Sequence, residues 1–303
     1  MPSKRSQDVL GLIRAHKKMA SDIGNGWLMK VDAPAEAVAK LRVNGTTGAV
    51  LPDLDMPAMM VTPGKVEVPD AALLHMHGGA YVSGGLLQCR KLISPICAAA
   101  GARALTFSYR LAPQYPYPAQ LEDAMRAYRY LLDAGFSPRR IAFVGESAGG
   151  NLALALALKL RDAGEALPGA IALLSPWADL AQTGESYAAL SDADATLDAE
   201  ELMKNAVDFA GSPERLRDAD ISPVYASFSG FPPVLIHCGT QEILLSDSEM
   251  LERAMLRDGV EAQLVRWEGM CHVFQAFGFE ESKAANRQIG QFLKKHLERD
   301  ASA

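Results

Sequence analysis

The sequence of 303 residues has no long apolar run, no cluster of like charge and no internal repeat. Its longest uninterrupted apolar stretch, Leu152–Leu158, is far shorter than the roughly 18 residues that a membrane span needs. The formal net charge is -6, so the basic footprint of a nucleic-acid-binding protein is missing. We therefore expect neither a membrane protein nor a nucleic-acid-binding protein.

Cysteine is also scarce, with four in the whole chain and none in a Cys-x-x-Cys spacing. This pattern argues against a disulfide framework and against a structural zinc site. The N-terminal segment is basic and has no apolar region followed by a small-residue cleavage site, which argues against a secretory signal. We expect reduced cysteines, a cytoplasmic location, and neither a cofactor nor a metal ion.

What the sequence does contain is an alternation of short β-rich runs and stretches of helical periodicity. This order predicts βαβ units in a mostly parallel sheet with helices on both faces. The predicted strands are Leu73–His77, Ala104–Tyr109, Ile141–Gly145, Ala170–Ser175, Val234–Gly239 and Gln263–Trp267. The predicted helices are Ala119–Ala134, Ala148–Ala163, Ser246–Arg257 and Glu280–Leu297.

Two segments stand outside this alternation. One is Met1–Val43, which has the pattern of an amphipathic helix, and the other is Ala181–Ile221, which is helical and rich in Asp and Glu. A single α/β core of about 200–250 residues leaves about 50–100 residues over, and these two segments account for them. These segments are either additions on the surface or elements with a role in function.

A serine motif lies between a predicted strand and a predicted helix. Gly145–Gly149 reads Gly-Glu-Ser-Ala-Gly and fits Gly-x-Ser-x-Gly, the strained turn that lifts a serine hydroxyl above a sheet edge. The motif alone is weak, but the apolar strand before it and the helix from Ala148 after it are the required context. We predict Ser147 as a nucleophile.

A second motif, His77–Ala80, reads His-Gly-Gly-Ala and follows another predicted strand. Two glycines allow backbone N–H groups to point at a substrate oxygen, as an oxyanion hole requires. We predict that the N–H groups of Gly78, Gly79 and Ala148 form this hole and that His77 is structural.

A serine nucleophile needs a base and an orienting acid, which follow it along the chain in this architecture. His272 follows the strand Gln263–Trp267 by a short loop, where a base would lie over the strand ends. The acid is Glu242 or Asp247. We favour Glu242, because residues 246–249 match a capping box that would engage Asp247 at a helix start.

These motifs together resemble a known family. In order they are His77-Gly78-Gly79-Ala80-Tyr81, Tyr109-Arg110-Leu111-Ala112-Pro113, Gly145–Gly150 and Ser175-Pro176-Trp177. They look like the hormone-sensitive-lipase-like branch of the α/β-hydrolases, the bacterial family IV carboxylesterases. The resemblance runs from about residue 70 to the C-terminus. The family often has Asp-Pro-Leu at the acid position, where this chain has Glu242-Ile243-Leu244.

The resemblance implies an α/β-hydrolase fold with an eight-stranded sheet and a serine carboxylesterase for short-to-medium acyl chains. Ser147, Glu242 and His272 would form its triad, and Trp177 and Tyr81 would contact substrate, although Trp177 also suits core packing. The resemblance further implies a helical cap from residues 1–43 and 181–221 over a core of residues 44–180 and 222–303. A small-molecule ester is the expected ligand, and a homodimer through the edge strand is implied.

Other functions on the same framework stay open at this point. An amidase or peptidase would use the same triad, since that triad also cleaves amides. A true lipase would accept long acyl chains, and a catalytically inactive relative would only bind its ligand.

Overall fold

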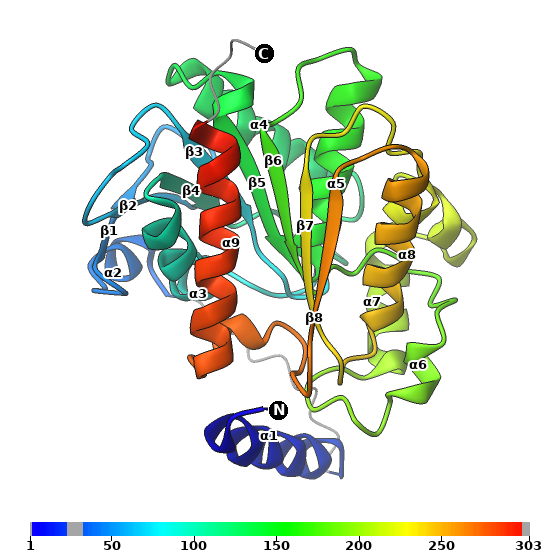
Figure 1. The fold of residues 1–303 in the computed structure, drawn as a ribbon. Helices are drawn as coiled ribbons and strands as arrows, with labels where there is room; N and C mark the ends of the chain where they lie inside the picture. The colour runs from blue at the N-terminus through cyan, green and yellow to red at the C-terminus, as the bar shows by residue number, and fades with distance from the viewer. Residues whose placement is uncertain (1, 23–32, 299–303) are drawn as a thin grey trace.

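Figure 1 shows the computed structural model, which describes residues 2–22 and 33–298. Its centre is an eight-stranded sheet in the order β1-β2-β4-β3-β5-β6-β7-β8. β1 pairs with β2 and β2 with β4 in antiparallel fashion, and every other pair is parallel, so the prediction of a mostly parallel eight-stranded sheet is confirmed. The strands are β1 (Thr46–Val50), β2 (Ala58–Pro63), β3 (Ala72–Met76), β4 (Arg103–Phe107), β5 (Ile141–Glu146), β6 (Ala170–Leu174), β7 (Val234–Gly239) and β8 (Ala262–Trp267).

Helices cover both faces of this sheet. α3 and α9 pack on one face, and α4, α5 and α8 pack on the other (Figure 1). The helices are α1 (Lys4–Asp22), α2 (Ala35–Ala39), α3 (Leu86–Ala100), α4 (Ala119–Asp133), α5 (Ala148–Asp162), α6 (Ser186–Ala189), α7 (Ala199–Ala210), α8 (Leu245–Arg257) and α9 (Glu280–Glu298). Short 3-10 turns are η1 (Pro138–Arg140), η2 (Pro213–Arg217), η3 (Pro223–Tyr225) and η4 (Phe274–Ala276).

The apolar runs of the central strands are buried on both sides of the sheet. Successive side chains of a strand point to opposite faces, so Leu73 packs under α3 and α9 while Leu74 packs under α4 and α5. The same alternation places Ala142 and Phe143 of β5 on opposite faces. A strand covered by helices on both faces therefore reads as a continuous apolar run in the sequence.

The alternation of patterns did not locate three elements, namely β1, β2 and α3. β1 is an outer strand whose five residues are mostly part-exposed, so it carries little apolar signal. α3 contains Pro95, a residue that normally interrupts helices, and it begins directly after two glycines.

α1, α6 and α7 lie near the carboxyl ends of the strands, where α1 lies beyond β8 and α6 lies beside α8 (Figure 1). Arg14 of α1 donates from Nε to the carbonyl oxygen of Ala193 at 3.2 Å and also binds the side chain of Gln241. Residues 23–32 of the predicted N-terminal segment lie outside the described residues. Within the described ranges, none of the helices combines the length and the apolar character needed to span a bilayer.

Candidate active site

The turn between β5 and α5 holds Ser147 in a conformation that favours glycine. Its φ is 54° and its ψ is -122°. The neighbouring positions have no room for side chains: a Cβ on Gly145 would lie 2.1 Å from the carbonyl oxygen of Gly149, and a Cβ on Gly149 would lie 2.0 Å from that of Met76. The glycines therefore permit the turn, which carries Ser147 to the carboxyl edge of the sheet at the start of α5.

A histidine and a carboxylate meet on two neighbouring loops. His272 follows β8 and Glu242 follows β7, and Nδ1 of His272 lies 2.7 Å from Oε2 of Glu242. The other oxygen of Glu242 accepts hydrogen bonds from the Gly239 amide at 2.6 Å and from the Ser175 hydroxyl at 2.8 Å. Glu242 is fully buried, so these bonds hold its carboxylate in one orientation.

The Ser175 hydroxyl connects three loops at this edge. Ser175 directly follows β6, donates to Glu242 on the loop after β7, and accepts from the backbone N–H of Val273 on the loop after β8 at 3.2 Å. Val273 adopts a φ of 46° directly after His272. The position of His272 therefore depends on a hydroxyl from a strand two places away in the sheet.

Asp247 lies away from His272. Its Oδ2 accepts hydrogen bonds from the amides of Ala178 and Asp179, each at 2.8 Å, and from the Tyr187 hydroxyl at 3.2 Å. The predicted capping box is wrong, because α8 begins at Leu245 and its start carries no side-chain cap. Burial raises the pKa of the Asp247 carboxyl well above its ordinary value.

The glycine loop after β3 is held by a residue that the sequence analysis did not single out. Oε1 of Glu146, the residue before Ser147, accepts the backbone N–H of Gly78 at 2.8 Å. This contact corrects the predicted oxyanion hole, because an N–H bonded to a carboxylate is not available to a substrate oxygen. The N–H groups of Gly79 and Ala80 have no hydrogen-bond partner in the part of the chain that the structure describes.

The second oxygen of Glu146 bonds to a histidine inside the sheet. Oε2 lies 2.8 Å from Nε2 of His75, whose Nδ1 lies 2.9 Å from the Thr106 hydroxyl. Burial by itself would lower the pKa of His75, but the adjacent Glu146 carboxylate raises it to about 10. His75 is therefore cationic at neutral pH, and Glu146 is one half of a buried ion pair.

His77 is structural, as its side chain contacts show. It is fully buried, its ring stacks on that of Tyr109 with centroids 4.0 Å apart, and its carbonyl oxygen accepts the Tyr109 hydroxyl at 2.7 Å. Burial lowers the pKa of His77 to about 4, so the ring is neutral at neutral pH.

The sequence model of a family described as the alpha/beta hydrolase fold matches residues 73–276, which is most of the chain. The chain belongs to the α/β-hydrolases. The turn that holds Ser147, the glycine loop and the loop of His272 all lie inside the matched range.

Relatives place this α/β-hydrolase in the hormone-sensitive-lipase branch. An acetyl-hydrolase of Streptomyces hygroscopicus is 40% identical over 225 residues, which cover 73% of this chain and 75% of that protein. The crystal structure of an esterase from the bacterial hormone-sensitive lipase family superposes with a TM-score of 0.86 at 35% identity, covering 98% of this chain and 99% of that one. The crystal structure of EstE5 soaked with p-nitrophenyl butyrate superposes with a TM-score of 0.85 at 30% identity, covering 98% and 100%.

In this α/β-hydrolase, Ser147 and His272 line one cavity of about 280 Å³. The glycine loop and Glu146 line the same cavity, and so do residues 196–198 and α7 of the segment after β6. Leucine, valine and phenylalanine side chains supply an apolar wall: Leu92, Leu197, Leu202, Val273 and Phe277. The cavity can therefore hold a small apolar group beside the serine hydroxyl.

The structure does not place Tyr81 or Trp177 in this cavity, contrary to the prediction that they contact substrate. Both side chains are fully buried. The Tyr81 ring stacks on Phe209 of α7 with centroids 3.7 Å apart, and its hydroxyl donates to Asn151 at 2.8 Å. These aromatics pack α7 against the α/β-hydrolase core, so they act as supports beneath the cavity.

Proposed function

We propose that this hydrolase cleaves carboxylic esters with short-to-medium acyl chains through an acyl-enzyme intermediate on Ser147. The enzyme class, carboxylic ester hydrolase, follows from membership of the family. One observation carries the finer assignment: Glu242 bonds to Nδ1 of His272, and His272 lines the same cavity as Ser147. A serine triad needs an acid bonded to the histidine and a histidine beside the serine, and these two features support the assignment.

The proposed reaction begins with attack of the Ser147 Oγ on the ester carbonyl carbon while Nε2 of His272 accepts the hydroxyl proton. The bond between Glu242 and Nδ1 keeps Nε2 as the nitrogen available for this transfer. His272 then protonates the departing alcohol, and the same nitrogen activates the water that releases the acid from Ser147. Glu242 orients the ring and stabilises its cationic form.

Gly79, Ala80 and Ala148 are the proposed donors to the oxyanion. Their N–H groups have no partner in the described part of the chain, and Gly79 and Ala80 line the cavity. Gly79 has a φ of 115°, and a Cβ there would lie 2.2 Å from the Ser83 carbonyl oxygen, so the loop needs a glycine at this position. Gly78 supports the hole instead, through its bond to Glu146.

The cavity volume favours short acyl groups. At about 280 Å³ it lies below the roughly 300–1,000 Å³ that is typical of sites for drug-sized ligands. We expect kcat/KM to be highest for acetyl to butyryl esters of p-nitrophenol and to fall steeply toward the palmitoyl ester. A maximum at palmitoyl would contradict this assignment and favour a true lipase.

The two helical segments act, in this proposal, as a split cap over the core. Residues 196–198 of the second segment and three residues of α7 line the cavity, and Arg14 connects the first segment to the loops near it. A cytoplasmic location and a homodimer through β8, which is an edge strand, stay predictions. Size-exclusion chromatography with light scattering tests the homodimer.

Substitution of Ser147 by alanine tests the proposal directly. We expect kcat for p-nitrophenyl butyrate to fall by about 10⁴-fold or more, and we expect a fluorophosphonate to label the wild-type protein but not Ser147→Ala. Hydrolysis by Ser147→Ala near the wild-type rate would overturn the proposal. Absence of labelling in the wild type would favour a binding protein, and preferential cleavage of p-nitroanilides would favour an amidase.

A further inference from the structure

A polar side chain lies among the apolar residues on the buried face of α7. The buried residues of this helix are Leu202, Asn205, Ala206, Phe209 and Ala210. Four of them are apolar, as a helix face packed on a core requires. The fifth, Asn205, is only 6% exposed, and its amide offers two N–H donors and one acceptor. Apolar packing does not explain an amide at this position.

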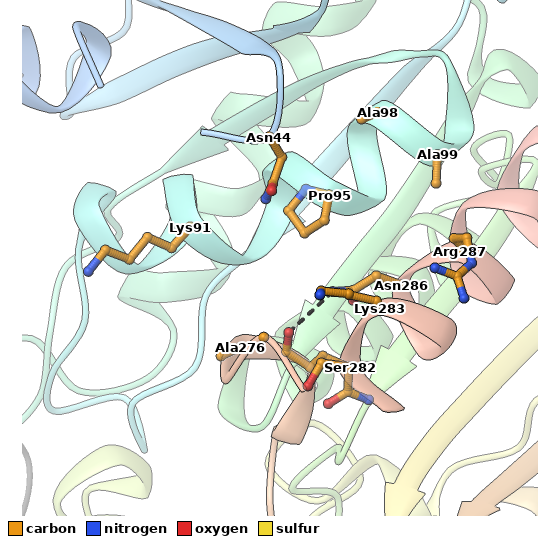
Figure 2. A pocket seen from close by; sticks show the side chains of 12 residues that line it. Asn44, Lys91, Pro95, Ala98, Ala99, Ala276, Ser282, Lys283, Asn286 and Arg287 are labelled. Carbon is orange, nitrogen blue, oxygen red and sulfur yellow. Dashed lines mark hydrogen bonds between the residues drawn. The ribbon is translucent and has the colours of Figure 1, made fainter. Parts of the chain in front are cut away.

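The Asn205 amide is accessible from the ester cavity. Asn205 lines this cavity together with Ser147 and His272, and its side chain has no hydrogen-bond partner within residues 2–22 and 33–298. A second cavity, between α3 and α9, is different (Figure 2). The unpartnered amide atoms of Gln275 and Asn286 at that cavity are closed off, whereas the polar atoms of Asn205 are not. A molecule bound in the ester cavity can therefore reach the Asn205 amide.

Both ends of α7 are fixed, so Asn205 has a defined position. At the start of the helix, the Asp198 side chain accepts two backbone N–H groups, at 2.9 and 3.0 Å. Near its end, the Phe209 ring stacks on Tyr81, and the Phe209 carbonyl oxygen accepts the Tyr117 amide at 2.8 Å. A polar group on an element that is held in this way can discriminate between ligands by the position of their own polar groups.

The residues that line the ester cavity indicate a neutral partner for this amide. Lys91 of α3 brings a positive charge to the cavity, and Asp198 and Glu201 bring negative charges. Because both signs are present, the cavity does not select a substrate of one charge. A hydroxyl group is neutral and both donates and accepts hydrogen bonds, which matches the donors and the acceptor of an amide.

We propose that Asn205 is a specificity-determining residue, which hydrogen-bonds a hydroxyl group that the ester carries beyond its scissile bond. This inference rests on the proposed esterase function and narrows its substrate class to esters of hydroxy acids or of polyols. The substrate hydroxyl donates to Oδ1 of Asn205 or accepts from Nδ2. An alkyl group at the same place would remove the amide from water without a replacement hydrogen bond, so such an ester is a poorer substrate.

Pairs of esters in which a hydroxyl replaces a methyl group test this preference. On the acyl side, the pair is p-nitrophenyl 3-hydroxypropanoate and p-nitrophenyl butyrate. On the alcohol side, the pairs are 2-hydroxyethyl acetate with propyl acetate and 4-hydroxybutyl acetate with pentyl acetate. For the full-length wild-type protein, we expect kcat/KM to be at least about tenfold higher for the hydroxylated member of at least one pair. A smaller preference in every pair would overturn the inference.

Asn205→Leu links the preference to this side chain, because leucine has nearly the same shape but no amide. We expect the ratio of the two kcat/KM values to fall to about one. A general disturbance of the fold would lower both members of a pair together, so this ratio reports the hydrogen bond. Lys204→Gln changes an exposed side chain of α7 that does not line the cavity, and it should keep the wild-type ratio. A ratio unchanged in Asn205→Leu, or lost equally in Lys204→Gln, would overturn the inference.

The same measurements separate this inference from the proposed esterase function. If the wild-type protein cleaves the esters without preferring the hydroxylated members, the role of Asn205 is wrong and the esterase function stands. If it cleaves none of them and a fluorophosphonate does not label Ser147, the esterase function is wrong and the role of Asn205 falls with it.

Discussion

Two pairs of glutamate and histidine flank the serine, and they differ in where the histidine lies. Glu242 bonds to His272 at 2.7 Å, and Glu146 bonds to His75 at 2.8 Å. His272 lines the cavity, whereas His75 lies within the sheet and is fully buried. The two pairs therefore have the same chemistry, but the histidine of the first lies at the cavity and the histidine of the second does not.

This difference separates the pair that we propose to transfer a proton from the pair that positions the glycine loop. His272 has its second ring nitrogen available to substrate, so the pair with Glu242 can act as a base in the proposed reaction. Both ring nitrogens of His75 already have partners, and the other oxygen of Glu146 accepts a hydrogen bond from the Gly78 amide. The second pair is therefore a fixed ionic support for the glycine loop.

The largest expected effect comes from breaking the first pair. Glu242→Gln keeps the shape of the side chain but presents Nδ1 with the wrong partner, and we expect kcat for p-nitrophenyl butyrate to fall by about 10³–10⁴-fold. Asp247→Asn is the matched control, since Asp247 does not contact His272, and its kcat should change by less than about tenfold. If only Asp247→Asn abolished activity, the acid would be wrongly assigned.

Breaking the second pair should have a smaller effect. Glu146→Gln weakens the hold on the Gly78 amide, and loss of one oxyanion donor costs about 10²–10³ in rate, so misalignment should lower kcat by about 10–10²-fold. KM should change little, because the oxyanion forms only in the transition state. Glu122→Gln, at an exposed carboxylate, is the control. A rise in KM at unchanged kcat would show that Glu146 acts on substrate binding instead.

The last expected effect is on stability instead of activity, and it should depend on pH. The pKa of His75 is raised from 6.5 to about 10 in the folded protein, so the folded state keeps a proton that the unfolded chain releases. This stabilisation is fully present below pH 6.5 and is lost as the pH rises toward about 10, at about 1 kcal/mol per pH unit.

Denaturation in urea between pH 6.5 and 10 measures this slope, with His75→Gln or Glu146→Gln as the reference protein. The difference in unfolding free energy between wild type and either variant should shrink as the pH rises. A difference that stays constant over this range would mean that the pair carries no charge in the folded protein.

The comparison also shows what the sequence could predict. The placement of Ser147, Glu242 and His272 at one edge of the sheet follows from local context and chain order, because each lies on the segment that follows a predicted strand. The role of Glu146 could not be predicted, since the spacing of residues 75 and 146 says nothing about which side chains meet across β3 and β5.

The remaining errors have physical causes. The Ser-x-x-Glu pattern at residues 246–249 suggests a helix start, yet α8 begins one residue earlier and buries Asp247 against the loop after β6. Tyr81 and Trp177 stand beside the predicted catalytic motifs in the sequence, but large aromatic side chains also suit core packing; both are buried, and Tyr81 stacks on Phe209 of α7. When a segment distant in the chain buries a residue, the sequence next to that residue does not reveal it.

The Ser175 hydroxyl has a consequence for how this enzyme could diversify. It bonds both to Glu242 on the loop after β7 and to Val273 on the loop after β8, so a change of length in either loop would disturb the other. Residues 196–198 and three residues of α7 line the cavity, and the hydrogen bonds of that hydroxyl within the described residues go to Glu242 and Val273 instead. New substrate preferences can therefore arise by exchange of this wall segment alone, while the loops joined by Ser175 are inherited as one block.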